Sequence, residues 1–137
     1  MLSNVFSDKI KVRVYFEDTD AGGVVYHSRY LNFAERARAE FLRKLKLNQT
    51  DIKMTYGIVF VVKSLEVNYI SFSRLDDKIE VITELKEINR AKLVFNHRFL
   101  TEKTKIAKIS VNICCINVAG KVARIPKSLY DKLILKG

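Results

Sequence analysis

The sequence predicts an α+β fold built from one long amphipathic helix and an antiparallel sheet of long strands. Two observations lead to this fold class. Apolar residues recur with helical spacing between Tyr30 and Leu45, and four long runs rich in β-branched and aromatic residues follow between Ile58 and Val118. The 137 residues suit one domain, 1–137, and contain no linker, internal repeat or low-complexity segment.

The first predicted element is a half-buried strand over Lys9 to Phe16. Its residues alternate in character, with Ile10, Val12, Val14 and Phe16 on one side and Lys11 and Arg13 on the other. A loop follows, and it reads EDTDAGGVVYH from Glu17 to His27. This loop concentrates glycine, aspartate and histidine in a chain that has only five glycines and two histidines.

The next predicted element is an amphipathic helix with a continuous apolar stripe. The stripe consists of Tyr30, Phe33, Ala34, Ala37, Phe41 and Leu45. The small alanines let a helix lie close against a sheet, and they also have high helix propensity. Charged residues occupy the rest of the helix surface, so we expect one face to be buried and one to face solvent.

After an irregular stretch around 48–57, the chain reads as strand almost continuously to Val118. We expect strands over 58–70, 78–88, 91–100 and 105–118, with turns at 71–77, 89–90, 101–104 and 119–120. Such short connections are typical of antiparallel hairpins. Pro126 suits the start of a short final helix, SLYDKLIL.

One helix covers only one face of so large a sheet. The strands also carry apolar residues on both parities, as in Ile58–Val62 and Ile113–Ile116. A second copy of the chain is the simplest cover for the remaining apolar surface, so we expect a homodimer or a higher oligomer.

The formal net charge of +10 favours an anionic partner: nucleic acid, a membrane surface or a phosphate-bearing ligand. The basic residues are spread over helix and strands rather than gathered in one tract, and no RRM-type or KH-type signature is present. We therefore expect no nucleic-acid partner.

The longest apolar run, Ile58 to Val62, is too short to span a bilayer, and the first residues lack the apolar region of a signal peptide. These features predict a cytoplasmic protein. Cys114 and Cys115 are adjacent and would point to opposite faces of a strand, so we interpret them as free, packing residues.

Three readings compete for the loop 17–27. A calcium loop starting at Asp18 would need a glutamate where Arg29 stands, and neither His27 nor His97 has a neighbour at zinc-ligand spacing, so no metal site is expected. A plain turn is the second reading, because aspartate and glycine are standard turn formers.

The third reading is catalytic. A carboxylate beside the free N–H groups of a helix start can activate water or attack a carbonyl, while the N–H groups stabilise the oxyanion that forms. Gly22 and Gly23 permit close backbone approach or a positive φ. These parts suit acyl transfer, and a thioester in particular, because its thiolate leaves easily.

The residues VRVYFEDTDAGGVVYHSRYLNFAERARAEFLRKL resemble the signature of the hotdog-fold acyl-CoA thioesterases, and more narrowly of their YbgC branch, which is associated with the Tol–Pal envelope system. 4-Hydroxybenzoyl-CoA thioesterase is a more distant relative. The resemblance continues through FVVKSLEVNY, RLDDKIEV and IPKSL. It implies a hotdog fold, in which a curved antiparallel β-sheet wraps a long central helix. It also implies a homodimer or homotetramer with active sites between subunits, and no cofactor.

The resemblance assigns the catalytic carboxylate to Asp20, as general base or nucleophile, and the carbonyl-polarising backbone N–H to His27. The His27 imidazole matches the YbgC branch; it either orients substrate or water, or only caps and packs the loop. Tyr26 either lines the acyl pocket or anchors the loop in the core, and Gly23 gives the substrate close access to the backbone. Asp18 is expected to shape the loop.

Phosphates of CoA call for basic residues at the pocket mouth. Arg90, in INRAK, matches an arginine of the relatives, and Arg124 lies one residue nearer Pro126 than theirs does. Lys127 is a third candidate, and solvated surface charge is the alternative for all three. His97, between Phe95 and Phe99 on a strand, is interpreted as a core histidine.

The predicted function is therefore hydrolysis of acyl-CoA to the free acid and CoA, with water as acceptor. The alternative is a non-catalytic basic scaffold, in peripheral contact with the anionic inner membrane surface or among envelope and phospholipid-synthesis proteins.

Overall fold

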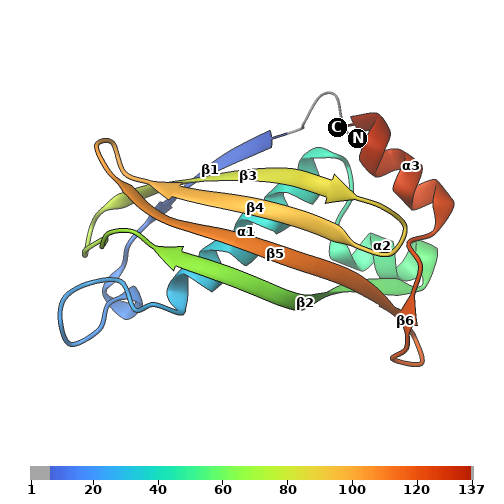
Figure 1. The fold of residues 1–137 in the computed structure, drawn as a ribbon, viewed down its shortest axis with the longest axis horizontal. Coiled ribbons are helices and arrows are strands. Elements are labelled where there is room, and N and C mark those ends of the chain that lie inside the picture. Colours follow the sequence, from blue (N-terminus) through green and yellow to red (C-terminus); the bar gives the residue numbers. More distant parts are fainter. Residues whose placement is uncertain (1–6, 137) are drawn as a thin grey trace.

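The computed structural model describes residues 7–136 as one curved antiparallel sheet around a long helix (Figure 1). The strands are β1 (Ser7–Arg13), β2 (Ile58–Tyr69), β3 (Lys78–Ile88), β4 (Leu93–Leu100), β5 (Lys105–Asn117) and β6 (Val122–Ala123). The helices are α1 (Arg29–Lys44), α2 (Gln49–Tyr56) and α3 (Lys127–Lys136), with a 3-10 turn, η1, at Phe16–Asp18.

The strands are ordered β1-β3-β4-β5-β2, with the short β6 paired to the end of β5. Antiparallel hairpins join β3 to β4 and β4 to β5, as predicted. The expectation of a hairpin between β2 and β3 is wrong, because β2 pairs with β5 while β3 pairs with β1. The segment 70–77 instead crosses the end of the sheet, where backbone bonds join Ile70 to Ile106 and Asp76 to Val14.

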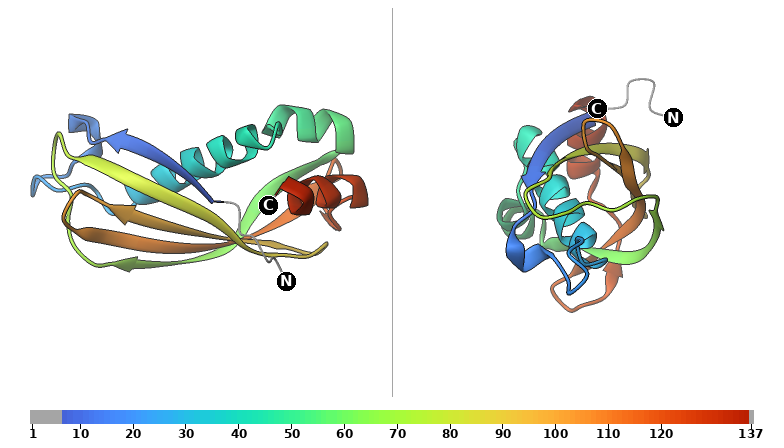
Figure 2. Two further views of the ribbon diagram at one scale, coloured as in Figure 1. Left: turned by 90° about the horizontal axis from the view of Figure 1, so that it is seen from above. Right: turned by 90° about the vertical axis from the view of Figure 1, so that its left-hand side faces the viewer.

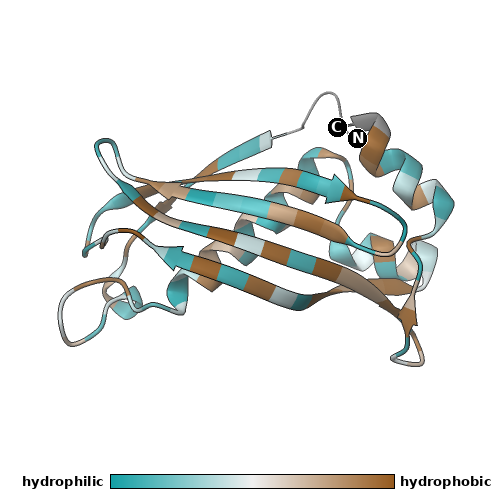
Figure 3. Ribbon diagram, viewed as in Figure 1, coloured by the Kyte–Doolittle hydropathy of each residue, from teal (hydrophilic) through white to brown (hydrophobic). Residues whose placement is uncertain are grey.

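Helix α1 packs its predicted apolar stripe into the concave face of the sheet. Every residue of that stripe is buried, and the end-on view in Figure 2 shows the sheet curving around the helix. Aromatic rings form the centre of this core, with Phe41 edge-on to Phe95 and Tyr30 edge-on to Phe99. The alternation of hydrophobic and hydrophilic residues along β3, β4 and β5 is visible in Figure 3, and it points one set of side chains at α1.

Two expectations about local structure are corrected. The first strand ends at Arg13 rather than Phe16, and Phe16 lies in η1 with 81% of the residue exposed. The chain turns there because the Asp18 carboxylate accepts the Tyr15 backbone N–H. The stretch expected to be irregular contains helix α2, whose ends are set by an Asn48 cap on the Asp51 N–H and by Gly57 in the left-handed conformation.

Both cysteines are free and buried, as expected. Helix α3 follows Pro126 and buries Leu129 and Leu133 in the core at the end of the sheet where α2 lies (Figure 1). Across the described residues 7–136, we find no helix whose length and apolarity would allow it to cross a bilayer.

Candidate active site

The loop between η1 and α1 is held rigidly by backbone contacts. Thr19 bridges to Val25 and Val24 bridges to Arg74, so the loop forms a small hairpin fastened to the crossing segment 70–77. The Val25 N–H donates to the Ser73 carbonyl at 2.8 Å. The loop is therefore a defined scaffold for whatever side chains it carries.

Asp18 is buried and shapes this loop, as the sequence predicts. Its Oδ2 accepts the Tyr15 N–H at 2.9 Å, and its Oδ1 lies 3.6 Å from the Nε of Arg29 in the first turn of α1. Its backbone carbonyl accepts the Tyr26 N–H at 2.8 Å. With both oxygens engaged and 5% of the residue exposed, Asp18 ties the strand, the loop and the helix together.

Asp20 differs from Asp18 in being exposed to solvent at the tip of the same loop. Its Oδ1 accepts the Gly22 N–H at 2.8 Å, which fixes the direction of the carboxylate. The described residues provide no hydrogen bond or ion pair to its Oδ2. Asp20 thus offers one oriented, accessible carboxylate oxygen.

Two glycines make the tip of this loop. A Cβ on Gly22 would lie 3.3 Å from Asp20 Oδ1, so the missing side chain leaves room for the carboxylate. Gly23 has φ +81°, a conformation that L-residues rarely adopt, and its N–H closes a turn onto the Asp20 carbonyl. The two adjacent glycines therefore serve different purposes: Gly22 leaves space for the carboxylate, and Gly23 permits the positive φ.

His27 lies two residues before the first residue of α1. The carbonyl of the preceding peptide, Tyr26 C=O, accepts the Arg29 N–H at 2.9 Å, and the His27 carbonyl accepts the Tyr69 hydroxyl at 2.8 Å. Within residues 7–136, no acceptor binds the His27 N–H. Its peptide is therefore fixed on both sides while its donor stays available.

Tyr26 does not anchor the loop in the core, because 47% of it is exposed. Its ring centroid lies 4.5 Å from that of His27, and both side chains face outward from the loop. The Tyr69 ring joins this group, lying 6.5 Å from His27 in an edge-on arrangement. No sequence pattern indicates Tyr69, since it lies 42 residues from His27 and only the fold brings them together.

Arg90 and Arg124 lie far from Asp20 within one chain. Arg90 is in the β3–β4 turn and Arg124 follows β6, both at the end of the sheet opposite the loop 19–28 (Figure 1). One donor of the Arg90 guanidinium is already engaged, since its Nε donates to the Ile125 carbonyl at 2.9 Å. Arg124 is exposed, and Lys127 pairs with Asp131 at 3.2 Å.

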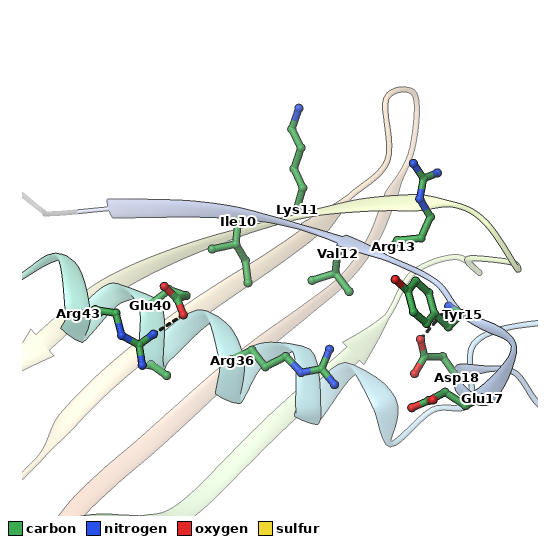
Figure 4. A pocket seen from close by; sticks show the side chains of 11 residues that line it. Ile10, Lys11, Val12, Arg13, Tyr15, Glu17, Asp18, Arg36, Glu40 and Arg43 are labelled. Atoms are coloured by element: carbon green, nitrogen blue, oxygen red, sulfur yellow. Dashed lines mark hydrogen bonds and ion pairs between the residues drawn. The ribbon is translucent and has the colours of Figure 1, made fainter. Parts of the chain in front are cut away.

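A cleft of about 630 Å³ lies between β1 and α1, close to this loop (Figure 4). Ile10 and Val12 extend from β1 toward the helix, and Arg36 and Arg43 extend along the helix side of the cleft. Asp18 lines one end of the cleft, whereas Asp20 and His27 do not line it. The cleft is therefore separate from the two candidate catalytic groups.

His97 is a core histidine, as predicted, and it is fully buried. Its Nδ1 lies 2.9 Å from the Thr83 hydroxyl and its Nε2 lies 3.2 Å from Arg38 Nη1. Burial, and secondarily the nearby Arg38 guanidinium, lower the pKa of His97 from 6.5 to about 3. Over residues 7–136, no three His, Cys, Asp or Glu side chains gather into a metal site.

The helix inside a curved sheet and the glycine-bearing carboxylate loop together define a hotdog-fold protein of the thioesterase type. Residues 14–133 match the family model described as the Thioesterase-like superfamily. The chain belongs to this superfamily, and the match covers nearly all of the described structure.

Named relatives narrow the comparison. The chain is 44% identical to the acyl-CoA thioesterase YbgC of Haemophilus influenzae over 122 residues, which cover 89% of this chain and 88% of that protein. It is 42% identical to the acyl-CoA thioester hydrolase YbgC of Escherichia coli O6:H1 over 120 residues, covering 86% and 89%. A crystal structure of a probable thioesterase from Bartonella henselae superposes with a TM-score of 0.82 at 33% identity, over 88% of this chain and 100% of that one.

Proposed function

We propose that the protein hydrolyses acyl-CoA thioesters, with Asp20 as the catalytic carboxylate and the backbone N–H of His27 as the oxyanion donor. The observation that carries this proposal is that the Asp20 carboxylate and the His27 backbone N–H lie on one loop, each held in a defined orientation. Asp20 has an oriented carboxylate with one oxygen that no group in residues 7–136 binds, and His27 has a fixed peptide whose N–H likewise meets no acceptor there. Relatives named as acyl-CoA thioesterases supply the substrate class.

In this proposal the thioester carbonyl oxygen binds the His27 N–H, which stabilises the negative charge that develops on it. Asp20 either takes a proton from water as that water attacks the carbonyl carbon, or attacks the carbon itself and forms an anhydride that water then hydrolyses. In both routes the C–S bond breaks and CoA leaves as a thiolate, which is then protonated. Gly23 and Tyr26 border the acyl group.

The complete site requires a second copy of the chain, in a homodimer or homotetramer. The outer edge of β2 pairs with no other strand of residues 7–136, and it exposes Val62, Leu65 and Tyr69 by 46%, 42% and 49%. Antiparallel pairing of two such edges sets the Tyr69 end of one β2 beside the Ile58 end of the other. In a dimer related by such a twofold axis, the same β2 edge of both copies forms the interface.

This pairing also accounts for the separation of the basic candidates from Asp20. The β3–β4 turn and β6 lie at the same end of the sheet as the start of β2 (Figure 1). In a dimer of this geometry, Arg90 and Arg124 of the second copy approach the loop that carries Asp20. Their guanidinium groups are then suited to the phosphates of CoA.

The test is release of CoA thiol from acyl-CoAs of short to long chain by the wild type and by Asp20→Asn. We expect the variant to fold and its kcat to fall by a factor on the order of 10²–10⁴, which is the usual contribution of a positioned acid or base. Asp76→Asn is the matched control, because Asp76 is exposed and its left-handed backbone suits asparagine. Unchanged kcat in Asp20→Asn would refute the assignment.

A second candidate function is a basic scaffold at an anionic membrane surface. The net charge of +10 favours it, together with a β5–β6 turn that exposes Val118 and Val122 beside Lys121. Binding to acidic vesicles without hydrolysis of any acyl-CoA would support this function over catalysis.

A further inference from the structure

We propose that the Tyr69 hydroxyl is a positioning group that holds the His27 peptide in the orientation required of an oxyanion donor. This inference rests on the proposed function, because it gives the His27 N–H its role. Tyr69 touches neither the thioester nor Asp20 in this proposal. It acts through the backbone of His27.

The contact joins two distant parts of the chain. Tyr69 is the last residue of β2, and its backbone is paired in register with Ala107 of β5. Its ring lies edge-on to the buried Tyr30, with centroids 5.8 Å apart. The sheet and the helix thus fix the ring, and the ring directs the hydroxyl at the His27 carbonyl, 2.8 Å away.

Two hydrogen bonds determine how the His27 backbone is turned. The Arg29 N–H holds the carbonyl of the peptide before His27, and the Tyr69 hydroxyl holds the carbonyl of the peptide after it. A trans peptide points its N–H opposite to its C=O, so holding the first peptide aims the His27 N–H. Holding the second peptide, whose carbonyl belongs to His27, restrains the φ and ψ angles of His27 between the two.

Tyr69 is the only side chain among the described residues that bonds to the His27 backbone. The neighbouring anchors, such as the Tyr26 N–H to the Asp18 carbonyl, are backbone contacts that substitutions leave intact. Burial raises the pKa of Tyr69 from 10.0, so the phenol remains a donor throughout the neutral range. Without this hydroxyl, the His27 peptide keeps one anchor and gains rotational freedom.

The experiment compares Tyr69→Phe with the wild type. The variant keeps the ring against Tyr30 and removes only the hydroxyl. An oxyanion donor works because it is preorganised, so we expect kcat to fall about tenfold, with KM within about twofold of the wild type. Tyr56→Phe on α2 is the matched control and should keep full activity, because within residues 7–136 its ring contacts Lys132 while its hydroxyl makes no hydrogen bond.

A second readout follows the peptide itself. In ¹H–¹⁵N spectra of the substrate-free protein, we expect Tyr69→Phe to shift and broaden the His27 amide while the amides of α2 stay unchanged. A fall in thermal stability parallel to the fall in kcat would instead assign the hydroxyl a structural role and overturn the proposal. So would wild-type kcat with an unchanged His27 amide.

The two proposals fail in different ways. If Asp20→Asn retains full turnover, the proposed chemistry is wrong whatever Tyr69 does. If Asp20→Asn is inactive and Tyr69→Phe has wild-type kcat, the chemistry stands and the positioning role is refuted. Loss of turnover in Asp20→Asn, together with a lower kcat in Tyr69→Phe at unchanged KM and stability, is the one pattern that supports both.

Discussion

Arg38 Nη1 lies 3.2 Å from Nε2 of His97, where helix α1 crosses the sheet. A guanidinium group only donates hydrogen bonds, so this nitrogen of His97 must be the unprotonated one. The other ring nitrogen then carries the proton and donates it to the Thr83 hydroxyl at 2.9 Å. The contact therefore requires a neutral imidazole in the folded protein.

This requirement predicts a loss of stability in acid. The pKa of His97 is about 3 in the folded protein and 6.5 in the unfolded chain, so between these pH values the unfolded state binds the extra proton. Stability should fall by up to about 1.4 kcal/mol per pH unit from this residue as the pH drops below 6.5. The free energy of unfolding, measured in urea between pH 4.5 and 7, should therefore depend on pH more steeply by this amount in the wild type than in His97→Gln.

The variant separates His97 from the carboxylates, which titrate in both proteins. Equal pH slopes in the two proteins would contradict the prediction. A ¹H NMR titration of the wild type gives a direct check, since a His97 ring that protonates near pH 6.5 would mean that Arg38 tolerates the charged imidazole.

Asp18 and Asp20 should respond differently to substitution although they are two residues apart. Asp18→Ala removes the acceptor of the partly buried Tyr15 N–H and the partner of Arg29, so the free energy of unfolding should fall by about 1–3 kcal/mol. Asp18→Asn should cost less, because its amide oxygen still accepts the Tyr15 N–H. Glu17→Ala, at an exposed neighbour, should change stability by less than about 0.5 kcal/mol. Chemical denaturation measures all three.

The two loop glycines should separate activity from stability. Gly22→Ala places a Cβ 3.3 Å from Asp20 Oδ1, so the exposed carboxylate has to shift by a few tenths of an ångström. We expect kcat to fall severalfold with little change in melting temperature. Gly23→Ala forces φ +81° on an L-residue and should destabilise the protein by about 1 kcal/mol or more. Equal effects of both substitutions on kcat and stability would contradict this division.

The sequence predicted the elements whose side-chain pattern is strong. The richness in β-branched and aromatic residues along 78–88 and 105–118 predicted β3 and β5, and the stripe from Tyr30 to Leu45 predicted α1. Helix α2 was missed because its eight residues bury only Ile52 and so have no apolar stripe. The Asn48 cap and Gly57 were the signals that marked its ends.

The order of the strands depends on contacts that no local pattern contains. The short segment 70–77 has the composition of a hairpin turn, but β1 occupies the edge of β3 and leaves β2 to pair with β5. The candidate site divides in the same way. The loop sequence indicated Asp20 and His27, whereas the Tyr69 contact depends on where β2 ends.

The edge of β2 that meets no other described strand leads to a last prediction, about assembly. Leu65 points toward the concave face, in register with the buried Val111, yet 42% of it is exposed in the single chain. A lysine at this position would put a charge into the interface that we propose, and charged side chains on edge strands prevent pairing between sheets. Sedimentation at micromolar concentration should therefore find the wild type as a dimer or tetramer and Leu65→Lys as a monomer. Met54→Lys, at an 80% exposed position on α2, should assemble like the wild type.

The same variant tests whether the site is shared between copies. If the site needs Arg90 and Arg124 from the second copy, the rate of CoA release by Leu65→Lys should fall in proportion to the fraction of dimer that is lost. A fully active monomer would show that one chain holds the whole site, and a wild type that sediments as a monomer would refute the assembly itself.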